Sequence, residues 1–208
     1  MSSAVQTQAV LSLDAQREAF ARRRFLAMPL AGLIAWSVIG LVGSVASLYV
    51  SVLTLYAATG SIVYLGMLLS RLTGENLMDK RRPKNEFDKL FMLTVAMALL
   101  VYAIALPFAA QDYSSLPMSV GILTGLMWLP VSWFIQHWIG IAHGVARTVL
   151  VLGAWYAFPD QRFVIIPAII VALYVVVIVV LERRWHALQA AEKGEREKPL
   201  PTTIVGLA

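Results

Sequence analysis

The chain alternates long uncharged stretches with short polar segments that carry almost all of its ionisable residues. Residues 25–70 hold no charged side chain. At about 1.5 Å per residue this stretch is roughly twice as long as the ~30 Å hydrocarbon core of a bilayer. We therefore expect two membrane-spanning helices here, joined by a turn around Gly40, Gly43 and Ser44, where glycines weaken the helix. Further uncharged or nearly uncharged stretches follow at 90–111, 113–136, 138–158 and 163–181.

The pattern predicts an all-α protein, a six-helix transmembrane bundle that occupies residues 25–184. Pro130 lies inside the fourth stretch, where its missing N–H should kink the helix. Residues 1–24 form an N-terminal segment on the cytoplasmic side. Residues 185–208 form a cytoplasmic tail that we expect to be largely disordered.

The N-terminal segment has two interpretations. Ser12 is suited to cap a short interfacial helix running to Arg24, with Leu13 and Phe20 on one face toward lipid and arginines toward headgroups. The alternative is a disordered leader.

Composition agrees with a membrane location. Of the 208 residues, 59% are hydrophobic and 14% are charged, with a mean hydropathy of +0.73, whereas soluble domains have about 25% charged residues. The net charge of +5 does not indicate nucleic acid, because the basic residues flank the predicted spans. The chain has no cysteine, which excludes disulfides, thiolate metal sites and thiol catalysis.

The basic residues also predict the orientation. With six spans, all the lysines and arginines except Arg162 fall on one side. Lysine and arginine are retained on the cytoplasmic side, so both termini are expected there. Within this side, Lys80, Arg81, Arg82 and Lys84 form a polybasic cluster, interpreted mainly as a topology determinant and alternatively as a binder of anionic lipid.

The acidic residues all fall outside the predicted hydrocarbon core. Proton relays and divalent-cation pathways commonly use carboxylates within the membrane. Transport by either of these routes is therefore disfavoured.

The fifth span carries the chemistry that the other spans lack. His143 and Arg147 lie four residues apart and share a helical face. Gly140 and Gly144 would let a neighbouring helix approach closely, so that the two cationic side chains face protein and not lipid.

An arginine at this depth is costly unless it is paired or faces water. We expect Arg147 to pair with Asp88 or Glu86 at the start of the third span, with Gln136 or His143 adding hydrogen bonds. The structural interpretation is a plain interhelical ion pair. The functional interpretation adds an anionic ligand, such as a lipid phosphate or a small carboxylate, bound by Arg147 and His143.

Two more side chains are candidates for lining such a ligand site, Trp133 and His137 near the end of the fourth span. Packing is the commoner role for an aromatic residue there. His137 and His143 lie about 120° apart on a helix, which makes them poor joint metal ligands. We expect no metal site and no cofactor.

Residues 67–155 resemble a family of small bacterial multi-pass membrane proteins classed as a domain of unknown function. The likeness rests on Leu69-Ser70 ending the second span, Pro83 and Asn85 leading into Leu90-Phe91, and Leu129-Pro130-x-x-Trp133. Where the family has a proline after the asparagine, this chain has Glu86. The resemblance implies the inner membrane of a bacterium and no known activity.

Three function classes stay open. The first is a non-enzymatic carrier or binder of a small or lipidic, anionic ligand, with membrane lipid as its partner. The second is an assembly or accessory partner of another membrane protein, or of a second copy of this chain. A lipid-modifying enzyme is third, because only His137 or His143 is suited to acid–base work near the interface.

Overall fold

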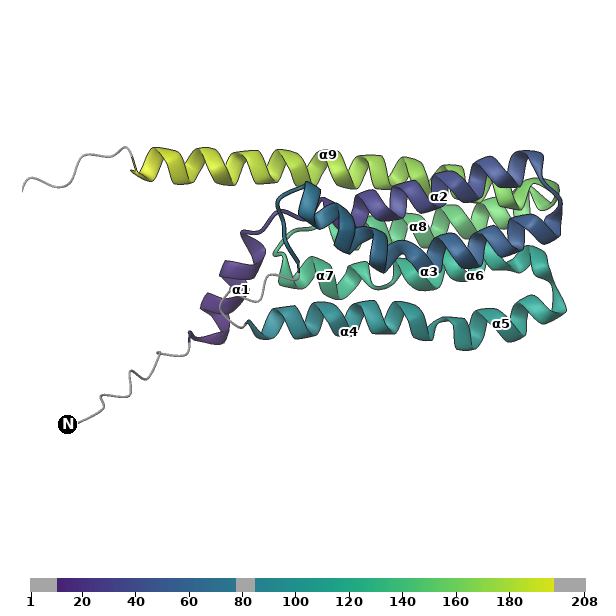
Figure 1. Ribbon diagram of the computed structural model, residues 1–208, viewed down its shortest axis with the longest axis horizontal. Coiled ribbons are helices and arrows are strands. Elements are labelled where there is room, and N and C mark those ends of the chain that lie inside the picture. Colours follow the sequence, from purple (N-terminus) through teal and green to yellow (C-terminus); the bar gives the residue numbers. More distant parts are fainter. Residues whose placement is uncertain (1–10, 78–84, 197–208) are drawn as a thin grey trace, which may run out of the picture.

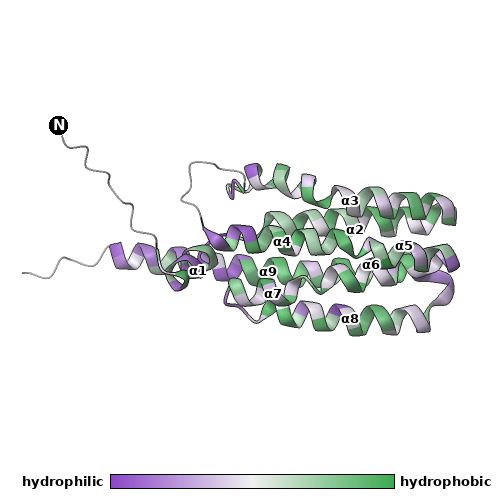
Figure 2. Cartoon of the chain, turned by 90° about the horizontal axis from the view of Figure 1, so that it is seen from below, coloured by the Kyte–Doolittle hydropathy of each residue, from purple (hydrophilic) through white to green (hydrophobic). Residues whose placement is uncertain are grey.

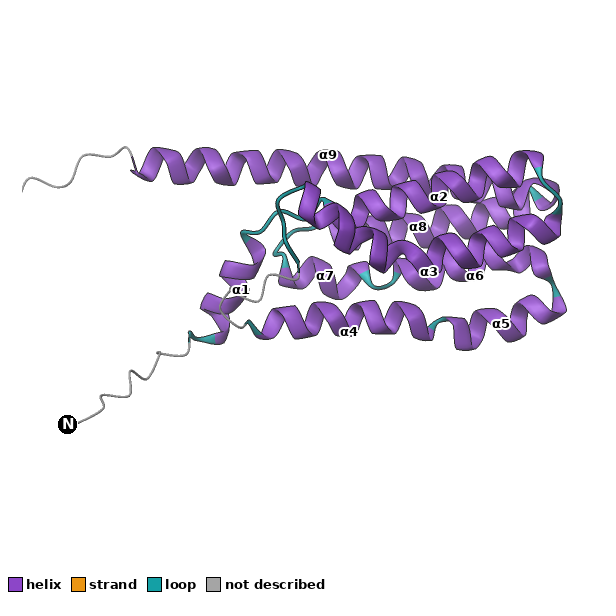
Figure 3. Cartoon of the chain, in the orientation of Figure 1, coloured by secondary structure: helices purple, strands orange, loops and turns teal. Residues whose placement is uncertain are grey.

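The computed structural model describes residues 11–77 and 85–196, and all the regular elements in this part of the chain are helices (Figures 1 and 3). The elements are α1 (Leu13–Ala21), α2 (Ala27–Val45), α3 (Leu48–Leu72), α4 (Glu86–Leu100), α5 (Tyr102–Gln111), η1 (Tyr113–Ser115), α6 (Leu116–Gly125), α7 (Trp128–Phe134), α8 (Ile139–Ala157), η2 (Pro159–Gln161) and α9 (Arg162–Arg196).

Six of these helical segments are long and apolar enough to cross a membrane, which confirms the predicted six-helix bundle. Three are the single helices α2, α3 and α8; the others are α4 with α5, η1 through α7, and η2 with α9. Hydrophobic residues run along the bundle and hydrophilic residues gather at its two ends (Figure 2).

Helix α2 packs against α3 and α9, and α8 packs against α6, α7 and α9. Helix α1 lies across one end of the bundle, against α4 and α7, and α9 extends beyond the other helices at this same end (Figure 1). We call it the α1 end; the far end carries the α2–α3 turn, η1 and η2. The interior includes Trp36, Ile39, Leu55, Ile166 and Ile170, all nearly inaccessible to solvent.

The turn between the first two spans lies at Ala46 and Ser47, so the predicted turn at Gly40, Gly43 and Ser44 is wrong. Both glycines are inside α2, where their missing side chains let α9 approach. A Cβ at Gly40 would lie 3.1 Å from the side chain of Pro167, and one at Gly43 would overlap the backbone of Phe163. Glycine serves packing here and not chain reversal.

The fourth span is interrupted as Pro130 predicts. Helix α6 ends at Gly125 and α7 begins at Trp128. Because Pro130 has no N–H, the carbonyl of Leu126 cannot accept the usual helical bond from it. That carbonyl instead accepts the N–H of Leu129 at 3.1 Å, a tighter turn.

Both terminal segments contain helix in the part that the structure describes. Ser12 caps α1 as predicted, accepting the N–H of Ala15 at 3.3 Å. Phe20, however, does not face lipid: it is 3% exposed and packs in the core. Residues 185–196 continue α9, and the disorder predicted after Gly194 falls mainly on residues that are not described. The polybasic cluster and residues 197–208 lie outside the described residues.

Candidate functional site

The predicted close approach at Gly140 and Gly144 is confirmed. A Cβ at Gly140 would lie 2.5 Å from the carbonyl oxygen of Trp128 in α7. A Cβ at Gly144 would lie 3.4 Å from the side chain of Leu129 in α7 and 3.5 Å from the carbonyl oxygen of Gly125 in α6. The same face of α8 therefore turns inward. His143 is 2% exposed and Arg147 is 1% exposed, so both are enclosed by protein.

Arg147 joins four helices. Its Nη1 donates to the hydroxyl of Tyr174 in α9 and its Nη2 to the hydroxyl of Thr124 in α6, each at 3.1 Å. Its guanidinium carbon lies 5.3 Å from the ring centre of Trp36 in α2 and 5.5 Å from that of Tyr174. Aromatic faces attract such a cation, but all of these partners are electrically neutral.

The pairing predicted between Arg147 and Asp88 or Glu86 is wrong. Asp88 binds both terminal nitrogens of Arg23, and Glu86 accepts from Lys89 at 2.9 Å. Both acids belong to the first turn of α4 at the α1 end. Arg147 lies about two turns inside α8, roughly 12 Å along the helix at 1.5 Å per residue, and so beyond their reach.

The structure does not bring the other three predicted residues to the buried arginine. With its amide oxygen turned toward Arg17, Gln136 accepts from that guanidinium at 3.0 and 3.3 Å. Trp133 is 58% exposed, with Arg17 4.8 Å above its ring centre. His137 stacks on Trp138 at 5.6 Å. Trp133 is near the end of α7, and Gln136 and His137 lie in the α7–α8 connection.

His143 lies in an aromatic setting beside Arg147. Its ring centre is 4.9 Å from that of Trp128 and 5.1 Å from that of Tyr174. Neither ring nitrogen of His143 has a hydrogen bond, and neither does the Nε of Arg147. Buried polar atoms are almost always hydrogen-bonded, so three such atoms on adjacent side chains require an explanation.

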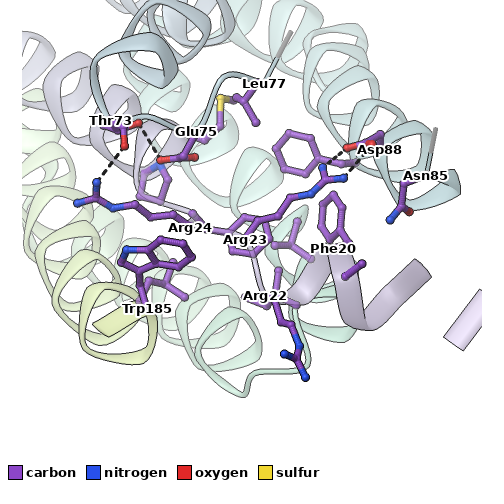
Figure 4. A pocket seen from close by; sticks show the side chains of 18 of the residues that line it. Phe20, Arg22, Arg23, Arg24, Thr73, Glu75, Leu77, Asn85, Asp88 and Trp185 are labelled. Atoms are coloured by element: carbon purple, nitrogen blue, oxygen red, sulfur yellow. Dashed lines mark hydrogen bonds and ion pairs between the residues drawn. The ribbon is translucent and has the colours of Figure 1, made fainter. Parts of the chain in front are cut away.

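A pocket of about 740 Å³ opens at the α1 end, between α1, the start of α2 and the ends of α4, α7 and α9. Figure 4 shows it from close by. Its apolar lining comes from α1, the spans and the connections next to them, and includes Phe20, Phe25, Met28, Phe91, Trp128, Val131, Ile135 and Leu181.

Arginines from the α1–α2 connection supply its polar rim. Arg23 and Arg24 extend in opposite directions across the pocket (Figure 4). Arg23 reaches Asp88, while Arg24 donates to Glu182 at 2.8 and 2.5 Å and to the carbonyl of Thr73 at 3.0 Å. These bonds fasten the segment before α2 to α4 and to α9.

Glu75 is the buried acid of this pocket, at 7% exposed. Its carboxylate accepts the N–H groups of Leu26 at 2.9 Å and Ala27 at 2.7 Å, and the hydroxyl of Thr73 at 3.0 Å. It thereby caps α2, whose own first residues provide no capping side chain. Burial raises the pKa of Glu75 above its ordinary value, although these hydrogen bonds act in the opposite direction.

Trp128 connects the two regions. Its side chain lines the pocket, and its ring also packs on His143 and, at 6.4 Å, on Tyr174. Trp128 thus lies between the pocket at the α1 end and the buried His143.

Comparison with known proteins identifies a family whose activity is unknown. The sequence model of a family of unknown function matches residues 13–184, which include α1, the first five spans and most of α9. The chain belongs to this family, DUF7010. No curated protein and no solved structure matches the DUF7010 chain. Its function must therefore be argued from its own residues.

Sequence reasoning missed the pocket. The sequence predicts that Arg22, Arg23 and Arg24 face headgroups and determine topology, yet Arg23 pairs with an acid 65 residues away and Arg24 with one 158 residues away. No local pattern indicates such distant partners. The available signal was Glu75, an acid only three residues beyond the end of a membrane-spanning helix.

Proposed function

We propose that this DUF7010 protein is a non-enzymatic binder or carrier of a membrane lipid, and that the lipid's phosphate head group occupies the pocket at the α1 end. The observation that carries the proposal is a pocket with an apolar floor built from the spans and a rim of arginines. It is the arrangement that an amphipathic ligand requires, because each part of the ligand finds a matching surface.

The size and the floor of the pocket fit an acyl chain next to its head group. Ligand pockets commonly measure ~300–1,000 Å³ and are mostly apolar with a few polar groups, and this one measures about 740 Å³. Phe20, Phe25 and Phe91 line it with Val131 and Leu181. These side chains offer the lipid tail the same environment as the bilayer.

The rim favours a phosphate. Arg22 pairs with Glu18, and both side chains are more than half exposed, so this pair is weak. Arg23 binds Asp88 through both terminal nitrogens, and that carboxylate is 47% exposed. A phosphate accepts bidentate, charge-assisted bonds from guanidinium groups and can therefore replace these carboxylates.

We propose further that the α1 end faces the cytoplasm of a bacterial inner membrane. The distribution of basic residues about the spans supports this orientation. A head group bound among Arg22, Arg23 and Arg24 would then belong to the inner leaflet.

The test uses the full-length chain in detergent and native mass spectrometry. Phosphatidylglycerol, phosphatidylethanolamine and diacylglycerol with the same acyl chains are offered in turn. We expect the two phospholipids to bind and diacylglycerol to bind much more weakly. Hydrogen bonds to charged groups contribute about 1.5–3 kcal/mol, so the double variant Arg22→Gln, Arg23→Gln should bind phospholipid at least about tenfold more weakly.

Arg183→Gln is the matched control, because Arg183 is an exposed arginine outside the pocket. It should bind phospholipid as the wild type does. Equal binding of diacylglycerol and phospholipid, or equal loss in the control and in the double variant, would overturn the proposal. A preference between the two phospholipids tells whether the head group's net charge matters in addition to its phosphate.

A further inference from the structure

A second polar cluster lies deeper in the bundle than the lipid pocket, and the pocket's arginines do not reach it. We define the Arg147 cluster as Arg147 and His143 of α8, Thr124 of α6 and Tyr174 of α9. Trp128 stands between it and the pocket. The cluster is independent of the lipid proposal in its residues and in its chemistry.

The cluster contains a positive charge without a negative one. The ion pairs among the described residues all lie at the two ends of the bundle, and none of them includes Arg147. Its hydrogen-bond partners are the hydroxyls of Tyr174 and Thr124. A buried charge is strongly disfavoured unless it is paired, and dipoles and aromatic faces compensate it only in part.

The unused hydrogen-bonding groups of the cluster lie together. The Nε of Arg147 and both ring nitrogens of His143 have no hydrogen bond and no contact with solvent. The backbone of Leu173 also faces the imidazole. Arg147 Nε is a donor, and a neutral imidazole offers one donor. The two side chains lie four residues apart on one face of α8, so these groups are neighbours.

We propose that Arg147 and His143 bind a small monovalent anion, of halide or carboxylate type, inside the bundle. A single negative charge neutralises the guanidinium, and the two unused N–H groups supply its hydrogen bonds. The close packing limits the anion's size: a Cβ at Gly125 would lie 2.8 Å from Cδ of Arg147, and one at Gly144 would touch Leu129 at 3.4 Å.

Trp128 lies between the pocket and this site. The ring of Trp128 is shared by the pocket wall and the His143 contact, at 4.9 Å between ring centres. Trp128 is the first residue of α7, directly after the interruption between α6 and α7. An anion that enters from the pocket would therefore have to pass this side chain.

The test measures how anions stabilise the full-length chain in detergent. The unfolding temperature is followed by intrinsic fluorescence while sodium gluconate is replaced by sodium chloride, or by sodium formate, at constant ionic strength. We expect the unfolding temperature to rise with chloride or formate, because a ligand that binds only the folded state stabilises it. Gluconate is too large for the site and should have no effect.

Two variants assign the effect to the cluster. Arg147→Gln retains an amide near the hydroxyls and removes the charge, and His143→Phe retains the ring packing and removes the nitrogens. Each should raise the apparent dissociation constant for the anion at least tenfold, and Arg183→Gln should leave it unchanged. If Arg147→Gln does not fold, equilibrium dialysis of radiolabelled chloride with His143→Phe gives the same comparison.

The proposal is overturned if gluconate acts as chloride and formate do, or if His143→Phe responds like the wild type. A response to chloride alone assigns a halide site, and a response to both assigns a general monovalent anion site. Lipid binding by His143→Phe is measured in parallel. Since His143 does not line the pocket, this variant should bind phospholipid normally. The two measurements therefore test the anion proposal and the lipid proposal independently.

Discussion

Replacing Gly140 with alanine tests whether α8 is held against α7 by backbone contact. The added carbon would lie 2.5 Å from the carbonyl oxygen of Trp128, 2.7 Å from Cβ of Ser132 and 3.0 Å from its Cα. Two of these atoms are backbone atoms that no side-chain rotation can move, so α8 must shift away from α7. Overpacking of this kind costs about 1–3 kcal/mol.

Gly153→Ala is the matched control. Gly153 lies on the same helix, and, apart from its chain neighbours and the adjacent backbone of α8, no described atom comes within 4 Å of the position of its added carbon. Both variants gain the same helix propensity, up to about 1 kcal/mol, so the difference between them isolates the overpacking. We expect Gly140→Ala to be less stable than Gly153→Ala by about 1–3 kcal/mol.

The assay is the titration of the purified protein from mild detergent into sodium dodecyl sulfate, followed by tryptophan fluorescence. The free energy of unfolding is obtained for the wild type and for both variants. Equal stability of the two variants would refute the reasoning, because it would mean that α8 and α7 do not touch at Gly140.

The six spans could be predicted because lipid imposes a simple condition on the sequence. Within the hydrocarbon core every backbone group must be bonded inside its own helix, and charged side chains are excluded from the lipid-facing surface. Stretch length and the placement of charges therefore locate each span. The fifth span, which contains His143 and Arg147, was found at 138–158 and is Ile139–Ala157 in the structure.

The roles of the glycines could not be predicted in this way. The same residue type ends helices and allows helices to touch, and the local sequence does not distinguish the two. Gly40 and Gly43 were assigned to a turn, and the structure uses both for contact with α9. The residues that decide the outcome, Phe163 and Pro167, lie more than a hundred positions later.

The candidate site was predictable only as far as it is local. Spacing placed His143 beside Arg147, and Gly140 indicated an inward face, since both inferences need only one helix. The partners of Arg147 come from other helices, and no short stretch of sequence determines how those helices align with α8. Tyr174 in particular is one of many apolar and aromatic positions in α9, and nothing local marks its hydroxyl as a ligand of the guanidinium.

Two further predictions test orientation and the buried acid. The chain has no native cysteine, so Asp160→Cys at the far end should react with an impermeant maleimide in intact cells and Glu195→Cys only after permeabilisation; the reverse pattern would reject the proposed orientation. Burial raises the pKa of Glu75 above its ordinary 4.5, so the folded chain holds this proton more tightly than the unfolded chain does. The contribution of Glu75 to stability is therefore most favourable at low pH and falls as the pH rises through the raised pKa. Glu75→Gln still offers an oxygen to the N–H groups of Leu26 and Ala27 but does not titrate. The free energy of unfolding of the variant, relative to that of the wild type, should therefore increase as the pH is raised from 4.5. A stability difference that stays constant with pH would show that burial does not disfavour the charged carboxylate.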